Sequence, residues 1–588
     1  MNEEYRYILM SFLPEIALTV LALLVLAVDL LLPKRNMRRG LVLVAALGCL
    51  VAMGLAGWQW FTAVNAAPKF VQQEIRQLAR QSVEILQPKH QAQLKQYKAR
   101  GIKMTKPSET AFGILLNAAS EPDGAMLNST ARETIFAYRT ARKQNTDLPA
   151  DTIGLAHPGI SVWWFFANDP FAAAFKLIFA MAALLVLLLS VRYPVDRYRA
   201  EFAALLLFAA VGLMVMVNSL DLVVLFLGLE LASLCLYALA AWQKDDARSA
   251  EAGVKYLLLG SLASAIYIFG VSLFFVQFGS THLSMLAQVF SPIFPLALIG
   301  FLMLLIGFGF KIAAAPFHVW APDVYQGAPI SLTAFLSTAS KAAGFAVLLR
   351  ALGMGFLSGS GQWWLLIAVM AALSMLIGNL VAVHQNNVKR MLAYSGIAQA
   401  GYLLIGVMAM GLAHQRHLQH QDNSLSLLGI TAVILYLFLY TAGNIGVFAV
   451  TGIVARETGS AEMSAFAGLR WRAPLLAFGM ALLLLSLGGI PLLAGFVGKW
   501  FLFLAGVYEG QYLLVLLGAA LSVVSIYYYL LLIKQMYIIP AAPDAKPIRV
   551  GALAGVGLLV IILLTVAIGV YPGPFFSLAQ SAAQSLMW

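Results

Sequence analysis

Apolar stretches of about 20 residues recur along almost the whole sequence, and this feature constrains the fold more than any other. A helix needs roughly 20 apolar residues to cross the hydrocarbon of a bilayer. Windows of about 19 residues give predicted spans near 8–32, 40–62, 170–190, 202–219, 221–242, 253–277, 294–315, 329–351, 362–383, 391–411, 425–452, 473–493, 511–534 and 549–571. We therefore predict an all-α polytopic membrane protein with about fourteen transmembrane helices.

The composition agrees with this prediction. Hydrophobic residues make up 61% of the 588 residues and charged residues only 11%, a balance outside the usual range of soluble domains. The first stretch follows Glu3 and Glu4 instead of a basic segment and has no small-residue cleavage site, so we expect a retained helix. The net charge of +12 comes from basic residues scattered through loops, which argues against nucleic acid as a partner.

Metal ligands and paired cysteines are scarce in this sequence. Cys49 and Cys235 lie in two distant predicted spans, so no disulfide, iron–sulfur or zinc spacing is available. His414, His417 and His420 recur every three residues but have no carboxylate at a fixed spacing. We therefore predict no metal site.

Basic residues gather in alternate loops between the predicted spans, and loops of this kind lie in the cytoplasm. These residues are Lys34, Arg35, Arg38, Arg39, Arg192, Arg197, Arg199, Lys244, Arg248, Lys389, Arg390, Arg470, Arg472 and Lys534. Both termini are therefore predicted on the outer side, which is the periplasmic side of a bacterial inner membrane.

The apolar pattern is interrupted once, from about Pro68 to Gly159, where charged and polar residues alternate with apolar ones. Helical spacing in FVQQEIRQLARQSVEIL predicts short helices outside the membrane. We therefore divide the chain into two transmembrane helices over 1–65, an outer-side helical insertion over 66–160, and a core of the remaining twelve helices over 161–588.

Four ionisable residues in or next to the predicted spans stand out, because an ionisable side chain costs roughly 2.5 to 3.5 kcal/mol at the centre of the bilayer. They are Glu230 in LFLGLELASL, Lys311 in GFGFKIAAAPFH, Lys341 in FLSTASKAAGF and Lys499 in GIPLLAGFVGKW. Such groups must be paired or hydrated, and they commonly mark proton paths. The alternative is that some of them only tie helices together as ion pairs or extend toward the membrane surface.

A buried lysine gives up its proton more readily than an exposed one, while a nearby carboxylate opposes this effect. We therefore predict that Glu230 and Lys311 form a switch in a proton relay, with Lys341 as the next station and Lys499 as a later one.

Helix-breaking residues accompany two of these lysines. Pro316 follows Lys311, and Gly489 and Pro491 precede Lys499. Irregular backbone at membrane depth is tolerated only where protein or water meets it, so we predict discontinuous helices at the seventh and twelfth spans. These two spans are five helices apart, which suggests two inverted five-helix repeats, helices four to eight and nine to thirteen.

Secondary relay candidates lie near the ends of the spans. They are Lys255, His318, Asp323, His384, Lys389 and Tyr394. For each of them an anchoring role at the membrane surface is an open alternative.

The runs around these residues resemble the antiporter-like membrane subunits of respiratory complex I, the proton-conducting family of the NADH-quinone oxidoreductases. The likeness rests on LFLGLELASL, GFGFKIAAAPFHVWAPDVYQGAP, FLSTASKAAGFAVLLR, NNVKRMLAYSGIAQAGYLLIG and GGIPLLAGFVGKW. It covers nearly the whole chain except about 66–160. The DVYQGAP run, the lysine at 499 and the end of the chain soon after the last span are typical of the N type within this family.

This resemblance implies that Glu230, Lys311, Lys341 and Lys499 transfer protons, driven by electron transfer from NADH to quinone in other subunits. It implies no cofactor in this chain, with FMN, iron–sulfur clusters and quinone held elsewhere, and it implies the other membrane subunits and the lipid bilayer as partners. Two alternatives stay open: an Mrp-type cation/proton antiporter subunit, and a membrane scaffold that transports nothing.

Overall fold

The computed structural model describes residues 12–31, 40–62, 165–190 except 168, and 199–586 except 292–293, 421–425, 542, 544 and 546. Within these ranges the chain is almost entirely helical, and strand pairing is limited to isolated bridges. The insertion predicted over 66–160 lies outside the described residues. The prediction of an all-helical polytopic membrane protein is confirmed at this level.

Eleven helices in the described ranges are long and apolar enough to cross a membrane. In chain order they are Gly40–Thr62, α7 (Pro170–Ser190), α8 (Arg199–Asn218), α9 (Leu222–Ala240), α10 (Ala247–Phe278), α12 (Pro295–Ile312), the composite segment Ile330–Gly355, α16 (Ser360–Ala382), α17 (Val388–His420), α18 (Ser426–Thr458) and α22 (Tyr512–Tyr537). The apolar helix α2 (Leu13–Leu31) precedes them. The number of spans, predicted as about fourteen, stays a prediction.

The remaining helices are shorter or bent. α23 (Ala552–Val570) meets α24 (Gly573–Gln584) at an angle of 86°. The others are α11 (Leu283–Val289), α13 (Trp320–Gly327), α19 (Leu469–Arg472), α20 (Pro474–Gly488) and α21 (Ala494–Tyr508). The predicted interval 473–493 stopped too early, because the apolar chain continues after the break as α21.

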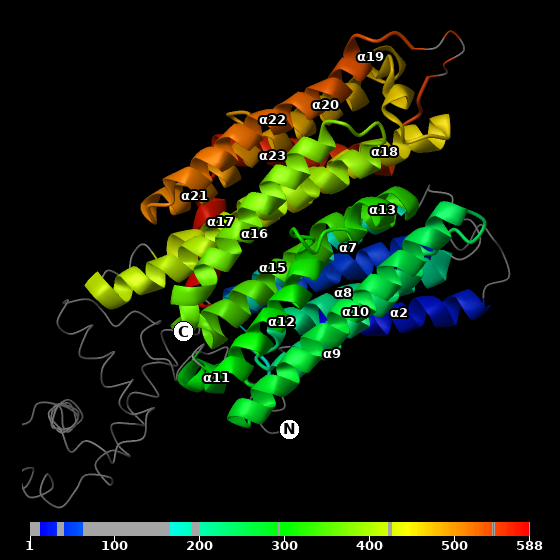
Figure 1. Ribbon diagram of the computed structural model, residues 1–588. Helices are drawn as coiled ribbons and strands as arrows, with labels where there is room; N and C mark the ends of the chain where they lie inside the picture. Colours follow the sequence, from blue (N-terminus) through cyan, green and yellow to red (C-terminus); the bar gives the residue numbers. More distant parts are fainter. Residues whose placement is uncertain are drawn as a thin grey trace, which may run out of the picture.

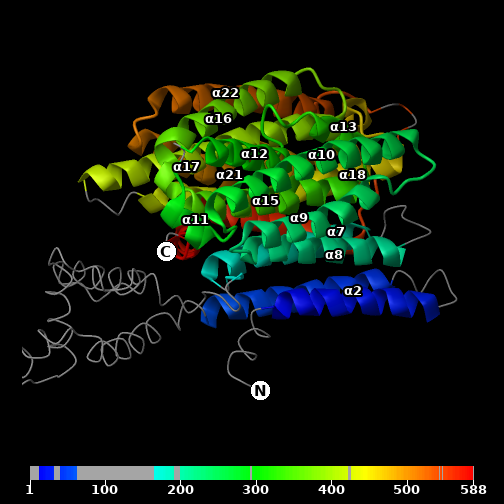
Figure 2. The ribbon, with the colours of Figure 1, turned by 60° about the horizontal axis from the view of Figure 1, so that its bottom comes forward.

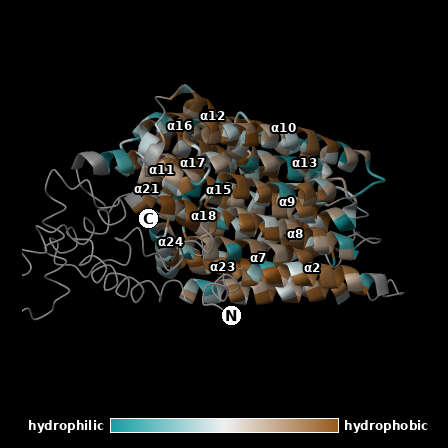
Figure 3. Cartoon of the chain, turned by 90° about the horizontal axis from the view of Figure 1, so that it is seen from below, coloured by the Kyte–Doolittle hydropathy of each residue, from teal (hydrophilic) through white to brown (hydrophobic). Residues whose placement is uncertain are grey.

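The helices run alongside one another and form two neighbouring groups, α7 to α15 and α16 to α23 (Figure 1). Figure 2 shows α2 at the edge of the bundle, where it packs on α8. Apolar residues cover most of the helix surfaces, and hydrophilic residues gather toward the helix ends (Figure 3). This distribution is the one expected of a bundle that faces lipid on its sides.

Small residues allow the closest helix contacts. A Cβ added to Gly212 on α8 would lie 2.5 Å from the backbone nitrogen of Ala232 on α9. Glycine therefore lets the two backbones approach, as is common between membrane helices.

The loops define two opposite ends of the bundle. At one end, the chain before α7 pairs with Ser219, and Asp221 pairs with His282 directly before α11; we call this the Asn218 end. At the other end, Lys389 Nζ donates to the carbonyl of Ala328, and residues 387 and 462 pair; we call this the Asp323 end.

Two helices stop at irregular backbone within the bundle. α12 ends at Ala313, which adopts a left-handed conformation (φ 55°). α20 ends at Gly489 (φ 90°), and Leu492 in the same break is also left-handed (φ 72°). A left-handed residue other than glycine costs about 1 to 2 kcal/mol, so it persists only where the surroundings require it.

The composite segment Ile330–Gly355 is buried along its whole apolar length. It consists of α14 (Ile330–Phe335), a π-helical turn η1 (Leu336–Ser340), α15 (Lys341–Arg350) and a second π-helical turn η2 (Ala351–Gly355). Wide turns of this kind are frequent at functional sites, and the first one ends directly before Lys341.

Candidate functional site

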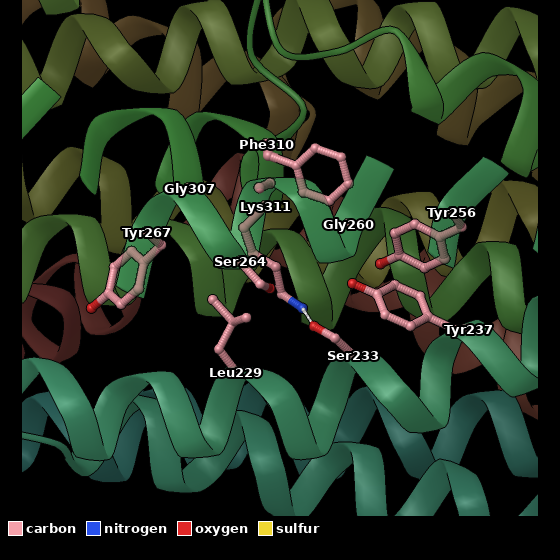
Figure 4. A pocket seen from close by; sticks show the side chains of 11 residues that line it. Leu229, Ser233, Tyr237, Tyr256, Gly260, Ser264, Tyr267, Gly307, Phe310 and Lys311 are labelled. Atoms are coloured by element: carbon pink, nitrogen blue, oxygen red, sulfur yellow. Dashed lines mark hydrogen bonds between the residues drawn. The ribbon is translucent and has the colours of Figure 1, made fainter. Parts of the chain in front are cut away.

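Lys311 lies in the last turn of α12, next to a small cavity among α9, α10 and α12. The cavity has room for roughly one water molecule. Its lining includes five residues that carry hydroxyl groups, Ser233, Tyr237, Tyr256, Ser264 and Tyr267 (Figure 4). Lys311 is 5% exposed, and its Nζ donates to Ser233 Oγ at 3.2 Å. A buried ammonium group beside hydroxyl groups and water-sized space can exchange a proton with water.

Glu230 lies on α9 one turn before Ser233 and directly after Leu229, both of which line the same cavity. Its Oε1 accepts a hydrogen bond from the hydroxyl of Ser264 on α10. In this part of the chain, no ion pair within 4.0 Å joins Glu230 to Lys311. The carboxylate and the ammonium group therefore contact different serine hydroxyls, Ser264 for Glu230 and Ser233 for Lys311.

Lys341 begins α15 directly after the π-helical turn and is 2% exposed. Its Nζ donates to the backbone carbonyl of Gly396 on α17. Asn444 on α18 donates to Ser337 Oγ at 2.8 Å and to the hydroxyl of Tyr440 at 3.1 Å. These contacts link the π-helical turn before Lys341 to polar side chains of α18.

Gln399 lies one turn after Gly396 on α17 and connects the surroundings of Lys341 with the break after α20. Tyr436 donates to Gln399 Oε1, and Gln399 Nε2 donates to the carbonyl of Leu487 at 3.3 Å. The next residue, Gly488, accepts from Lys499. A buried row of polar groups thus runs between the two lysines.

Lys499 extends from α21 toward the C-terminal end of α20. Its Nζ donates to the carbonyl of Gly488 at 3.1 Å and to Ser522 Oγ at 2.9 Å, and it lies 4.8 Å from the centre of the Tyr402 ring. Lysines are favoured near helix C-termini, where free carbonyl groups carry partial negative charge. Lys311 and Lys499 are alike in lying beside a helix break and in donating to a serine hydroxyl, although proline and lysine occur in opposite order in the two breaks.

Asp323 on α13 is the centre of a charged group at the Asp323 end. Its two oxygens lie 2.6 Å from Lys255 Nζ and 2.5 Å from Arg390 Nη1. Burial alone would raise the pKa of Asp323, but the hydrogen bonds from Lys255 and Arg390 bring it below its ordinary value. Tyr256, the residue after Lys255, lines the Lys311 cavity, so this group adjoins the site.

The other secondary candidates have varied surroundings. His318 lies in the break before α13, where burial lowers its pKa and keeps the imidazole neutral at pH 7. Lys389 is tied to the carbonyl of Ala328 at 2.8 Å. His384 is exposed. The guanidinium of Arg390 lies over the ring of Tyr394, 5.9 Å from the centre of that ring. The surroundings of His384 and Tyr394 resemble those of anchoring residues at a membrane surface. Lys389 is 8% exposed and binds a backbone carbonyl as Lys341 does, so its part in the relay stays a prediction.

Replacing Asp323 with asparagine is expected to lower thermal stability by about 1 kcal/mol or less, since the ion pairs are partly exposed. An acid with a lowered pKa contributes its stability above its ordinary pKa near 3.9 and loses it as pH falls further. The melting temperatures of wild type and variant should therefore differ equally from pH 6 to 9 and converge below about pH 4. A difference that disappears at pH 7 would contradict this assignment.

The sequence-based reasoning missed a second buried charged group, at the Asn218 end. Lys176 Nζ lies 2.8 Å from Glu15 Oε1, and Arg350 makes two bonds of 2.8 and 2.9 Å to Asp169. We call these residues the four-charge cluster. The lysine in PFAAAFKLIF could have been found, since it stands seven residues into a predicted span. Its partners lie far away in sequence and could not.

No group of three or more His, Cys, Asp or Glu side chains in the described ranges could hold a metal ion.

Comparison with known proteins places this geometry in a family. The family described as NADH:quinone oxidoreductase/Mrp antiporter, TM matches residues 219–525. NADH-quinone oxidoreductase subunit N of Desulfitobacterium hafniense is 42% identical over 428 residues, which are 72% of this chain and 86% of the relative. The range 219–525, which the family model matches, includes Glu230, Lys311, Lys341 and Lys499.

Solved structures show the same fold. A chain of respiratory complex I from Thermus thermophilus, solved with bound aureothin, superposes with a TM-score of 0.59 at 33% identity, covering 70% of this chain and 86% of that chain. A chain of the Mrp complex from Dietzia sp. gives a TM-score of 0.69 at 19% identity, covering 100% and 98%. The second likeness shows the fold alone. The family model covers more than half of the chain, and the Desulfitobacterium relative is 42% identical over 72% of it. This chain therefore belongs to the antiporter-like family, as a member of the subunit N group of NADH-quinone oxidoreductases.

Proposed function

We propose that this chain moves protons across the membrane as a subunit of a NADH-quinone oxidoreductase, driven by electron transfer from NADH to quinone in other subunits. The observation that carries the proposal is the row of buried lysines at Lys311, Lys341 and Lys499. All three are at most 5% exposed, and among the described residues their ammonium groups contact hydroxyl or carbonyl oxygens and no carboxylate within 4.0 Å. Lysines without a carboxylate partner can lose their protons reversibly.

Glu230 controls the first of these lysines in this proposal. When the carboxylate lies near Lys311, it favours the charged ammonium; when Ser264 holds it away, the proton is released more easily. Release from Lys311 changes the field at Lys341 and then at Lys499. Energy from the redox subunits enters as movement of charge along this row, and each charge moved across 100 mV stores about 2.3 kcal/mol.

The two broken segments suit a pair of inverted five-helix repeats. Each holds a lysine ammonium near the C-terminal end of its first half, α12 in one and α20 in the other. The basic loop residues Lys389, Arg390 and Arg472 suit a cytoplasmic Asp323 end, which leaves both termini on the outer side of a bacterial inner membrane.

The partners in this proposal are the other membrane subunits of the complex and the surrounding lipid. Glu230 is only partly buried on a membrane helix, so a neighbouring subunit is suited to cover it. FMN, iron–sulfur clusters and quinone reside in other subunits. The Mrp-type alternative shares the fold, but the Mrp likeness has 19% identity against 42% for a subunit N relative.

The test uses the assembled complex in membrane vesicles with Lys311→Met and Glu230→Gln. NADH-driven quinone reduction and proton uptake are followed together, with the complex quantified in each membrane. Both variants are expected to assemble, and proton uptake should fall at least tenfold with quinone reduction falling alongside, because the steps are coupled. Lys244→Met, in a loop at the Asp323 end, serves as the matched control and should behave as wild type.

Two results would separate the alternatives. Unchanged proton uptake in both assembled variants would contradict the proton relay and favour a membrane scaffold that transports nothing. Sodium- or potassium-dependent proton exchange in vesicles without NADH would favour an antiporter instead.

A further inference from the structure

The four-charge cluster lies outside the lysine row, yet it contains a second lysine–carboxylate pair within the bundle. Glu15 is the third residue of α2, and Lys176 is the seventh residue of α7. Their side chains are 5% and 0% exposed, and the ion pair measures 2.8 Å. Burying charged side chains in a membrane protein costs several kcal/mol, and such residues are commonly functional.

Two polar side chains contact the pair. Asn218, the last residue of α8, donates to Glu15 Oε1 at 2.8 Å, and Lys176 Nζ lies 3.5 Å from Gln59 Oε1. The charged groups that face Lys176 from other elements are Glu15, Asp169 and Arg350. Two acids and two bases leave the cluster neutral overall.

Three polar atoms of this region have no protein partner among the described residues. They are Glu15 Oε2, Asn218 Oδ1 and Arg350 Nε, in side chains that are all at most 5% exposed. A buried polar atom without a partner costs about 1 to 3 kcal/mol, and ordered water normally satisfies it. The unsatisfied atoms therefore point to water inside the cluster.

The two ion pairs differ in what they can do with that water. The Arg350 guanidinium keeps its proton under all physiological conditions, so its bidentate pair with Asp169 is fixed. Lys176 and Glu15 can both gain and lose a proton. Arg350 also ends the helix that Lys341 begins, which places the cluster about 13 Å from Lys341, toward the Asn218 end.

We propose that Glu15 and Lys176, with water, form a proton-exchanging station at the Asn218 end, and that Asp169 and Arg350 hold it in place. In the step, the Lys176 ammonium passes a proton to the Glu15 carboxylate, which leaves a neutral amine and a carboxylic acid. The acid releases its proton to water at the Asn218 end, and the amine takes up a proton arriving from the middle of the membrane. One proton moves, and only N–H and O–H bonds change. This inference rests on the proposed function, since it adds a station to the same transport.

The deciding variant is Lys176→Arg in the assembled complex, because arginine keeps the charge and the ion pair but does not release a proton. The matched control is Lys244→Arg, which makes the same chemical change at an exposed lysine in the loop after α9. We expect Lys176→Arg to assemble and to move fewer protons per NADH oxidised than wild type, while Lys244→Arg keeps the wild-type ratio.

The double variant Glu15→Gln/Lys176→Met decides the question if Lys176→Arg fails to assemble. It removes both charges together, so no buried charge is left unpaired. A wild-type ratio of protons to NADH in either assembled variant would overturn the proposal and leave the pair as a structural anchor of α2. Lys311→Met is measured in parallel: full proton uptake there marks failure of the proposed function itself, whatever Lys176→Arg shows.

Discussion

Replacing Arg350 with methionine is expected to remove most of the protein from the membrane. Arg350 is fully buried and makes both of its close ion contacts with Asp169. Methionine fills similar space but leaves the carboxylate buried without a partner, and breaking a buried pair in this way costs about 3 to 5 kcal/mol. A loss of that size is a large fraction of the stability of a domain. The amount of subunit per milligram of membrane, with and without inhibition of proteolysis, measures the effect.

Two further variants test the cause of that loss. Arg470→Met makes the same chemical change at an exposed arginine and should leave the amount of protein unchanged. Arg350→Met/Asp169→Asn removes both charges and should recover part of the protein, because asparagine can still accept the 2.7 Å hydrogen bond from the Ala172 amide at the start of α7. If Arg350→Met accumulates as wild type does, the pair contributes little and the energetic argument is wrong.

Replacing Lys499 with methionine is expected to give the opposite combination, an assembled complex with poor transport. The Gly488 carbonyl at the helix break keeps a donor in this variant, because Ser522 Oγ also donates to it, at 3.2 Å. Folding should therefore tolerate the loss of the ammonium group, while the proposed station disappears. We expect at least a tenfold loss of coupled proton uptake with near-normal amounts of subunit, measured in the same vesicles.

The double variant Lys499→Met/Ser522→Ala checks this division of roles. It leaves the Gly488 carbonyl without either side-chain donor, so the amount of subunit should fall well below that of either single variant. Ser522→Ala alone keeps Lys499 as a donor and should retain both assembly and transport. Equal amounts of subunit in all three variants would contradict the structural role of Ser522.

The apolar pattern was sufficient to predict the helical class and to place a helix in each predicted interval. It could not predict where helices stop at the breaks. The end of α20 depends on Gly489 and Leu492 in left-handed conformations, and α21 then continues past the predicted limit. The polar composition of GPFFSLAQSAAQ hid α24, whose sequence is too mixed to score as a span.

Charged residues in the middle of spans were easy to single out, and Lys311, Lys341 and Lys499 are all buried in the structure. Their partners were not predictable, because Lys341 and Lys499 bind backbone carbonyls that carry no signature in the sequence. The pairs of Glu15 with Lys176 and of Asp169 with Arg350 join positions more than 150 residues apart. A single sequence contains the charges but not their pairing.

The composite segment from Ile330 to Gly355 is the least apolar of the spanning candidates and the one that is wholly enclosed by other helices. It carries Lys341 and Arg350, so it is poorly suited to rest in lipid while the chain is being synthesised. Its neighbours include α18, which is made about a hundred residues later. The segment therefore reaches its final surroundings only after the second half of the chain has been inserted, and ribosome-bound chains that end before α18 should expose it to lipid or to an insertion factor.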